Sequence, residues 1–344
     1  MLLLKFLLAN QQCPLGTVKL SPTPKKTAGF TLIELLVGMI IAVLVITPVL
    51  GFMLNILQTD RREQAKVNTE QEIQAAADFI ARDLQQSVFI YDAPGIYGPG
   101  GNDGIKNELA NITNVPNGEP ILVFWKRTFL VDELSQDFTA LCTDATKATC
   151  NDAFVYSLVA YYLVSDGTTA SIERFELEGG IGEDDDDNDI QDIKPQETGF
   201  QFNLDTLAGE SLEEKLNNWE RSTVSTGTDP TSDVLINNID HSTAGVPSEA
   251  CPDDPSTPAL EWEQVPRHTG TGAVGTNFQT FSFYTCIYSP EGQPDERIAK
   301  VFLRGNALAR INSSDNDYTT KRENLFPRAA IQVQGTGQLG QGSQ

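Results

Sequence analysis

Residues 25–50 read KKTAGFTLIELLVGMIIAVLVITPVL, and this stretch decides how the rest of the chain is organised. It opens with Lys25 and Lys26 and passes into an apolar run without a charged residue over residues 35–59. These 25 residues would form about 37 Å of α-helix, whereas a bilayer core of about 30 Å needs roughly 20 residues. The run therefore predicts a membrane-spanning helix, and it is too long for the apolar part of a cleaved secretory signal.

Charge is distributed unevenly along the 344 residues, whose formal net charge is −23. Residues 1–29 contain four lysines and no acidic residue, so the remainder carries −27. A basic head, an apolar run and an acidic body form the order expected of an exported protein. Lys25 and Lys26 favour a cytoplasmic N-terminus, although Arg61 and Arg62 after the run act in the opposite sense. The acidic body argues against nucleic acid as a partner.

The segment GFTLIEL, residues 29–35, resembles the N-terminal signature of type IV pilins and pseudopilins. In that family a membrane peptidase cuts after the glycine and methylates the new N-terminal residue. The resemblance implies a leader over residues 1–29, a cut between Gly29 and Phe30, and a structural subunit without catalytic residues. The implied partners are the prepilin peptidase, other pilins and an assembly platform in the inner membrane.

Glu34 is the one acid at the edge of the apolar run, and by the resemblance it is the fifth residue of the mature chain. A buried carboxylate without a partner is strongly destabilising. The amine of Phe30 on a neighbouring subunit can supply that partner and set the axial register; the alternative is a solvated position among lipid headgroups. Pro48, with Gly51 nearby, predicts a kink where the helix bends or melts during assembly, or a kink without a role.

The helical pattern continues beyond the membrane, which predicts one helix from about Phe30 to about Phe89. Its apolar residues recur at three- and four-residue spacing: Ile73, Ala76, Ala77, Ile80, Leu84 and Val88. Its polar face is predicted to hold Gln71, Glu72, Gln74, Asp78, Arg82, Asp83 and Gln85. We assign residues 30–59 to the anchor and 60–90 to an amphipathic stalk. The segment ADFIARDLQQS, residues 77–87, resembles the helix end of larger minor pilins and J-type pseudopilins.

The remaining body, residues 91–333, predicts a periplasmic head rich in β-strands. Short runs of β-forming residues stand at 121–125, 154–164, 172–177, 278–288 and 298–304. Polar, turn-rich stretches separate them, and two long insertions are expected at 179–200 and 222–275. The expected fold class is α+β, a long N-terminal helix with an antiparallel sheet packed on its stalk. Residues 334–344 are expected to be a disordered tail.

Four cysteines remain if the leader with Cys13 is removed, namely Cys142, Cys150, Cys251 and Cys286. An even number favours disulfides in an oxidising compartment, with four unrelated thiols as the alternative. Three connectivities are possible, and the sequential pairing is the simplest.

Other motifs give little support for a cofactor or an enzyme. The acidic run at 183–192 offers Asp185, Asp187 and Asp189 as calcium ligands, but it lacks the glycine and the closing glutamate of an EF-hand. A solvated acidic loop is its usual meaning. The glycine pattern at 270–275 precedes a strand-like segment rather than a helix, so it does not predict a nucleotide site. The two histidines, His241 and His268, have no metal-ligand neighbours at helical spacing.

Three functions remain open. The anchor, the body and the segment VFLRGNALARI, residues 301–311, resemble the pseudopilins of hormogonium polysaccharide secretion in filamentous cyanobacteria. That resemblance implies a minor pseudopilin for polysaccharide export and gliding motility. The second hypothesis is a minor type IV pilus subunit of the PilW kind, in pilus assembly or adhesion. The third is a membrane-tethered carbohydrate-binding protein that stacks sugars on Trp125, Trp219 and Trp262.

Overall fold

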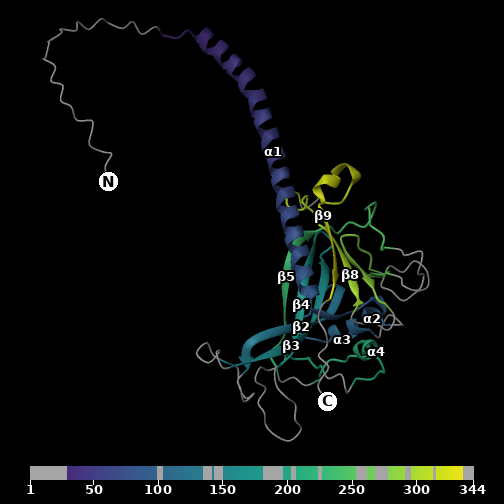
Figure 1. The fold of residues 1–344 in the computed structure, drawn as a ribbon. Helices are drawn as coiled ribbons and strands as arrows, with labels where there is room; N and C mark the ends of the chain where they lie inside the picture. The colour runs from purple at the N-terminus through teal and green to yellow at the C-terminus, as the bar shows by residue number, and fades with distance from the viewer. Residues whose placement is uncertain are drawn as a thin grey trace, which may run out of the picture. The chain divides into compact units, whose positions relative to one another are not determined.

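Figure 1 shows the computed structural model, which describes residues 29–98, 104–134, 142, 150–180, 197–202, 207–223, 227–252, 262–267, 278–290, 296–312 and 315–335. The chain divides into two compact units, Met1–Ile56 and Leu57–Gln344. Four predicted features lie outside the described residues: the leader up to residue 28, the acidic loop with Asp185, Asp187 and Asp189, the glycine pattern at 270–275, and the tail beyond residue 335.

One helix, α1 (Leu32–Gln85), contains both the apolar run and the amphipathic run. Between residues 52 and 85 it holds neither glycine nor proline, and it is rich in Ala, Leu, Gln and Glu, which are good helix formers. The prediction of a long N-terminal helix is therefore confirmed.

In the second unit α1 buries one face. The buried residues are Ala65, Thr69, Ile73, Ala76, Ala77, Ile80, Asp83 and Leu84. Their spacing of three or four residues places them on one side of the helix, and they include the predicted apolar stripe up to Leu84. Asp83 was predicted on the polar face and this is wrong, because it follows Ile80 by three residues and lies on the buried side.

The end of α1 also differs from the prediction of helix to Phe89. The helix ends at Gln85, and β1 (Ser87–Ile90) follows at once. All four residues of β1 are buried, and Phe89 lies opposite Trp125 in the neighbouring strand. Val88 continues the helical spacing, but a partner strand distant in the sequence makes the extended conformation more stable.

Five antiparallel strands form the first sheet, in the order β1-β2-β3-β4-β5. The last four are β2 (Glu119–Leu134), β3 (Asn151–Ser165), β4 (Ala170–Glu178) and β5 (Thr231–Ile239). The strands β2 and β3 pair from Glu119 opposite Leu163 to Leu134 opposite Asn151. This sheet contains the predicted runs at 121–125, 154–164 and 172–177.

Four antiparallel strands form the second sheet, in the order β6-β7-β8-β9. They are β6 (Trp262–Val265), β7 (Phe283–Tyr288), β8 (Ile298–Arg304) and β9 (Arg328–Gln334). The hydroxyl of Thr285 in β7 donates to the carbonyl of Ile121 in β2 at 3.1 Å, which joins the two sheets. The α+β fold with an antiparallel, β-rich head is confirmed.

Two strands lie where the sequence predicted an insertion, residues 222–275. One is β5, whose sequence TSDVLINNI mixes polar and apolar residues because it forms the edge of its sheet. The other is β6, with only four residues. Neither presents the apolar alternation by which a strand is recognised.

Four short helical segments complete the described head: α2 (Ala93–Tyr97), α3 (Ile105–Leu109), α4 (Leu212–Asn217) and η3 (Thr320–Leu325). The main core combines the buried face of α1 with side chains of both sheets. Trp125 lies fully buried in it and donates its indole N–H to the hydroxyl of Tyr91 at 3.0 Å. That hydroxyl donates in turn to the carbonyl of Leu216 at 2.8 Å, so the buried polar atoms are paired.

Candidate assembly segment and its attachment to the head

The predicted cleavage point lies just before α1. Gly29 and Phe30 precede the helix, and the side chain of Phe30 is 80% exposed. Thr31 caps the helix, because its hydroxyl and its carbonyl both accept from the backbone N–H of Glu34, at 3.3 and 3.1 Å. An exposed peptide bond ahead of a capped helix is one that a protease can bind in extended form.

Glu34 lies in the first turn of α1, three residues after the cap. A carboxylate is favoured there by the partial positive charge of the helix N-terminus. Among the described residues its side chain has no hydrogen bond or ion pair. The sequence therefore places an acid without an internal partner at the start of an apolar helix, and the structure leaves it exposed.

The helix beyond Glu34 presents apolar side chains all round. Large exposed residues of this part include Leu36, Ile40, Leu44, Leu50 and Leu57. The segment is long and apolar enough to cross a membrane, and none of its most apolar window is buried. Such a surface needs lipid or other apolar helices to cover it, because exposing it to water is unfavourable by about 25 cal/mol per Å².

Pro48 lies inside α1 and the helix continues through it. Proline has no N–H to offer the carbonyl of Leu44 one turn earlier. Next to it, the hydroxyl of Thr47 donates to the carbonyl of Val43 at 2.8 Å. This turn is thus held by fewer backbone hydrogen bonds than its neighbours, which keeps the prediction of a local bend or melting point open.

The C-terminal turn of α1 is attached to the first sheet by a buried charge cluster around Asp83. Arg174 of β4 donates its Nε to Asp83 Oδ2 at 2.7 Å, and the Tyr161 hydroxyl of β3 donates to the same oxygen at 2.7 Å. Lys126 of β2 places its Nζ 3.4 Å from Asp83 Oδ1. Glu176 completes the cluster, 2.8 Å from Lys126 and 2.7 Å from Arg174. Two acids and two bases are thus paired across α1, β2 and β4.

The electrostatics of this cluster favour the ionised forms. Burial opposes ionisation of Asp83, but the hydrogen bond and charge of Arg174, together with Lys126, hold its pKa below the ordinary value. The pKa of Glu176 is lowered against the same burial by Arg174 and Lys126. Sequence reasoning missed this cluster. The available signal was an acid whose helical spacing put it on the apolar stripe.

A second attachment joins α1 to the chain after β8. Arg310 donates its Nε to the Thr69 hydroxyl at 3.1 Å and pairs with Glu72 one turn along. Gly305 packs so tightly that an added Cβ would lie 2.5 Å from Thr69 Cγ2 and 2.9 Å from Ile73 Cγ1. The segment 301–311, singled out in the sequence, therefore contacts the stalk part of α1.

Both disulfides link consecutive cysteines among the four that follow Cys13. Cys142 pairs with Cys150, with their Cα atoms 6.5 Å apart, and Cys251 pairs with Cys286, at 5.6 Å. Cys286 is fully buried in β7, so its bond ties a loop to the interior of the second sheet. This is the sequential connectivity, the simplest of the three.

Two of the three tryptophans proposed for sugar stacking lie in the core. Trp125 and Trp219 are buried and meet edge to face, with ring centroids 5.7 Å apart. Trp262 is only partly buried, but it packs beside Tyr288 in the other sheet. The enclosed rings of Trp125 and Trp219 have no face left for a sugar. Sugar stacking on Trp262 stays a prediction.

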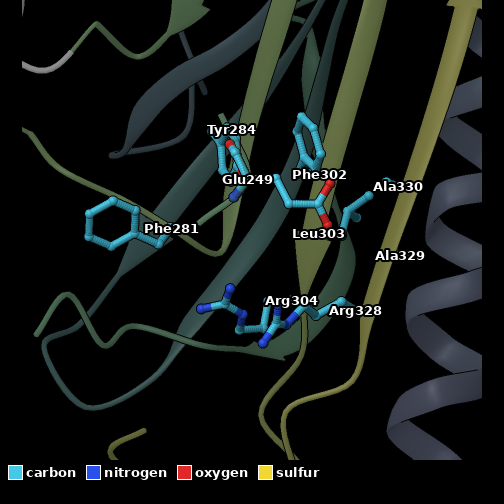
Figure 2. A pocket seen from close by; sticks show the side chains of 9 residues that line it. All are labelled: Glu249, Phe281, Tyr284, Phe302, Leu303, Arg304, Arg328, Ala329 and Ala330. Atoms are coloured by element: carbon cyan, nitrogen blue, oxygen red, sulfur yellow. The ribbon is translucent and has the colours of Figure 1, made fainter. Parts of the chain in front are cut away.

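A pocket of about 140 Å³ opens beside β7, β8 and β9. Figure 2 shows Arg304 and Arg328 at one end, with the carboxylate of Glu249 away from them. Burial and the nearby charge of Arg328 lower the pKa of Arg304. Asp240 lies 3.8 Å from Arg304, and Glu323 pairs with Arg328 at 2.7 Å. Each of the two guanidinium groups therefore lies beside an acid at the edge of the pocket.

Metal ligands do not gather in the described part of the chain, where no group of three or more His, Cys, Asp or Glu could hold an ion. His241 lies 3.1 Å from Asp317 and pairs with that single acid. His268 and the predicted calcium ligands lie outside the described residues.

Comparison with known families agrees with the anchor geometry. Residues 24–50 match the prokaryotic N-terminal methylation motif. No curated protein and no solved structure matches the chain. The match covers the predicted cleavage point and most of the apolar segment, and it supports a type IV pilin-like structural subunit rather than an enzyme. It also implies processing by prepilin peptidase, other pilins as partners, and a single membrane anchor.

Proposed function

We propose that this chain is a minor pseudopilin of a periplasmic filament that serves polysaccharide secretion and gliding motility. Its parts are a leader over residues 1–29, an anchor over 30–59, a stalk over 60–90, a head over 91–333 and a tail over 334–344. Cleavage after Gly29 releases the mature subunit, which waits in the inner membrane and then enters the filament.

The observation that best supports this proposal is the set of features at the start of α1. An exposed Gly29–Phe30 junction precedes an apolar helix that nothing covers in the described structure, and Glu34 lies in its first turn. In water, such an uncovered apolar helix would be unfavourable. A subunit that moves from lipid into an apolar helical bundle needs it in both places.

Glu34 has a specific role in this proposal. On leaving the lipid surface, its carboxylate would be buried among apolar helices, where it must be paired. The methylated amine of Phe30 on a neighbouring subunit is a cation at the matching depth. This pair sets the axial position of the incoming subunit.

The proposed topology has a cytoplasmic N-terminus and a periplasmic head. Two observations support it: Lys25 and Lys26 precede the apolar segment, and both disulfides belong to the chain that follows it. Lysines are retained on the cytoplasmic side, and disulfides persist in oxidising compartments.

The first test is mass spectrometry of the N-terminus of the protein extracted from native membranes. We expect a chain that begins at Phe30 and carries one methyl group on its amine. A chain that begins at Met1, or at any residue other than Phe30, would contradict the proposal and leave an ordinary tethered protein.

The choice between secretion and a pilus needs a second measurement. Deleting the gene should lower released polysaccharide and gliding while surface pili remain. Loss of pili with unchanged polysaccharide release would instead identify a PilW-like pilus subunit.

A further inference from the structure

The second sheet has an inward face and an outward face, because side chains alternate along each strand and cross-strand partners share a side. Ile287, Val301 and Leu303 belong to the main core, so their positions define the inward face. Tyr284 and Phe302 form a separate cluster on the other side. The outward positions are therefore every second residue that begins at Trp262 in β6, Tyr284 in β7, Ile298 in β8 and Arg328 in β9.

One half of the outward face is covered by residues 247–251 of the same chain. The hydroxyl of Tyr284 donates to the carbonyl of Glu249 at 2.9 Å, and the disulfide of Cys286 holds the end of this segment. The rings of Tyr284 and Phe302 stack in this half, which Figure 2 shows, and they are 3% and 5% exposed. The most apolar part of the face is therefore already closed within the molecule.

The other half of the outward face is polar and partly exposed. Two rows of side chains cross all four strands here, one from Trp262 to Gln334 and the next from Gln264 to Gln332. The two glutamines of β9 are exposed, and the remaining side chains are partly buried. None of the three glutamines forms a side-chain hydrogen bond with another described residue. We define the open face as Trp262, Gln264, Tyr288, Lys300, Gln332 and Gln334.

No acidic residue occupies an outward position of the four described strands of this sheet. The positions hold aromatic and aliphatic side chains, amides, a disulfide cysteine and three cations. The chain as a whole has a formal net charge of −23, so a sheet face without an acid is unusual for it. An anionic partner that most of this protein would repel is therefore not repelled by this face.

Lys300 is the one cation of the open face. Its Nζ lies 4.7 Å from the centroid of the Phe302 ring, and it forms no ion pair with a described residue. The acids Glu249 and Glu323 stand at the covered half, where Glu323 pairs with Arg328 at 2.7 Å. An ammonium group without a counter-charge, beside neutral amides, attracts an anionic group of a ligand.

The composition of the open face fits a polysaccharide better than a peptide. A glutamine side chain both donates and accepts hydrogen bonds, as a sugar hydroxyl does. The partly exposed rings of Trp262 and Tyr288 lie 5.5 Å apart, tilted by 39°, and provide apolar surface beside the amides. Four strands at a spacing of about 4.8 Å give each row a length of roughly 14 Å, enough for a few linked sugar rings. A peptide would more commonly pair with a strand edge.

We propose that the open face binds a chain of an anionic polysaccharide. Lys300 contacts a carboxylate or a sulfate group, the glutamines bind hydroxyl groups, and Trp262 packs against a sugar ring. The inference rests on the proposed function in polysaccharide secretion, and it names the part of the head that meets the exported polymer.

The test is affinity electrophoresis of the full-length, processed protein in detergent, with the polysaccharide that the cells release cast into a native gel. We expect the polymer to retard the protein. Carboxyl reduction or desulfation of the polymer should weaken binding about fivefold, the upper range for one exposed ion pair, and the treatment that does so identifies the anionic group.

Lys300 provides the charge variants. Lys300→Glu should weaken binding about tenfold, because it replaces an attraction by a repulsion, and Lys300→Arg should bind as the native protein does. The control is Lys321→Glu, the same charge change at an exposed lysine of η3, which should leave retardation unchanged.

The neutral contacts are tested separately. Gln332→Ala should weaken binding about threefold, the effect of one hydrogen bond, and Trp262→Ala should weaken it at least as much. Gln71→Ala, at an exposed position of α1, is the matched control and should have no effect. Disulfide formation reports folding of every variant, and the N-terminal mass reports processing.

Polyglutamate in the gel tests the alternative of an acidic peptide. Equal retardation by polyglutamate, no retardation by the released polysaccharide, or unchanged binding of Lys300→Glu and Trp262→Ala would each overturn the inference. In these cases the proposed function stands if Phe30 is methylated and deletion of the gene lowers polysaccharide release. An unmethylated Phe30 overturns both, whatever the gel shows.

Discussion

Glu34 has little effect on the stability of the single subunit, but we expect it to be important for assembly. In the structure it is exposed in the first turn of α1, where the helix N-terminus favours its charge. The same carboxylate becomes destabilising only when apolar helices surround it and no cation pairs with it. Its importance is therefore expected in assembly, and not in folding or membrane insertion.

Glu34→Ala should insert and be cleaved as the native chain is, but its incorporation into filaments should fall at least about tenfold, since a buried charge pair is lost. The measurement is the ratio of filament-bound to membrane-bound protein after shearing. Glu63→Ala, beyond the apolar run, is the matched control and should assemble normally. Normal assembly of Glu34→Ala would remove the role in register.

Asp83 is the second residue whose contribution depends on its surroundings. It is 8% exposed and contacts Arg174, Lys126 and Tyr161 from three strands. Asp83→Asn leaves two buried cations with Glu176 as their remaining counter-charge. We expect a loss of roughly 3 kcal/mol in the free energy of unfolding, the lower end for a broken buried pair. Urea unfolding of the detergent-solubilised chain measures it, with the exposed Asp78→Asn as a control within about 0.5 kcal/mol.

The loss should depend on pH with a definite sign. The pKa of Asp83 is lowered in the folded state, so its contribution is complete above the ordinary carboxyl pKa of about 4 and declines as pH falls below it. The difference in the free energy of unfolding between the native protein and Asp83→Asn should therefore decrease at acidic pH. If this difference in unfolding free energy stayed constant from neutral pH down to about pH 2, the charge of Asp83 would not be the cause of the lost stability.

At the scale of elements, α1 is one helix with two segments that face different surroundings. Its first part is apolar on all sides, and its second part is apolar on one stripe only. The first part contains Gly38, Pro48 and Gly51, whereas the second part has neither glycine nor proline. The pattern of side chains, and not helix propensity, therefore decides which part faces lipid and which part supports the head.

Ile80→Ala should destabilise the head by about 2–5 kcal/mol, because it removes a fully buried side chain from the stripe and leaves a cavity. Val67→Ala on the same helix, at a 44% exposed position, should cost less than about 1 kcal/mol. Urea midpoints of both variants give the comparison. Equal losses would mean that the stripe is not the contact that holds the helix.

At the scale of the whole molecule, the two disulfides constrain segments of different size. The bond Cys251–Cys286 spans 35 residues and Cys142–Cys150 spans 8. Loop-closure entropy predicts about 3.8 kcal/mol for the first and about 2.5 kcal/mol for the second. Paired serine substitutions, compared by urea unfolding under oxidising conditions, should show the larger loss for Cys251 and Cys286. The reverse order would indicate that the Cys142–Cys150 bond restricts more of the unfolded chain than the loop between its two cysteines.

The sequence by itself determined the features that depend on neighbours along the chain. The apolar run, its flanking lysines, Glu34 and the junction at Gly29 are all local. Helical periodicity found the buried stripe of α1, and β-forming runs found five of the nine strands in the described head. The consecutive pairing of the cysteines was also the simplest choice. The apolar run, the buried stripe and the strand runs follow from periodicity, charge or spacing within a short window, whereas the predicted junction at Gly29 and the role of Glu34 come from the resemblance to pilins.

Only the tertiary structure decided the features whose energy comes from distant partners. The change from helix to strand at Ser87 depends on pairing with residues near 125, and the ionised state of Asp83 depends on Arg174 in β4. The edge position of β5 follows only from its pairing with β4. A window of sequence contains none of these partners, because long-range pairing, and not local preference, provides the free energy that selects them.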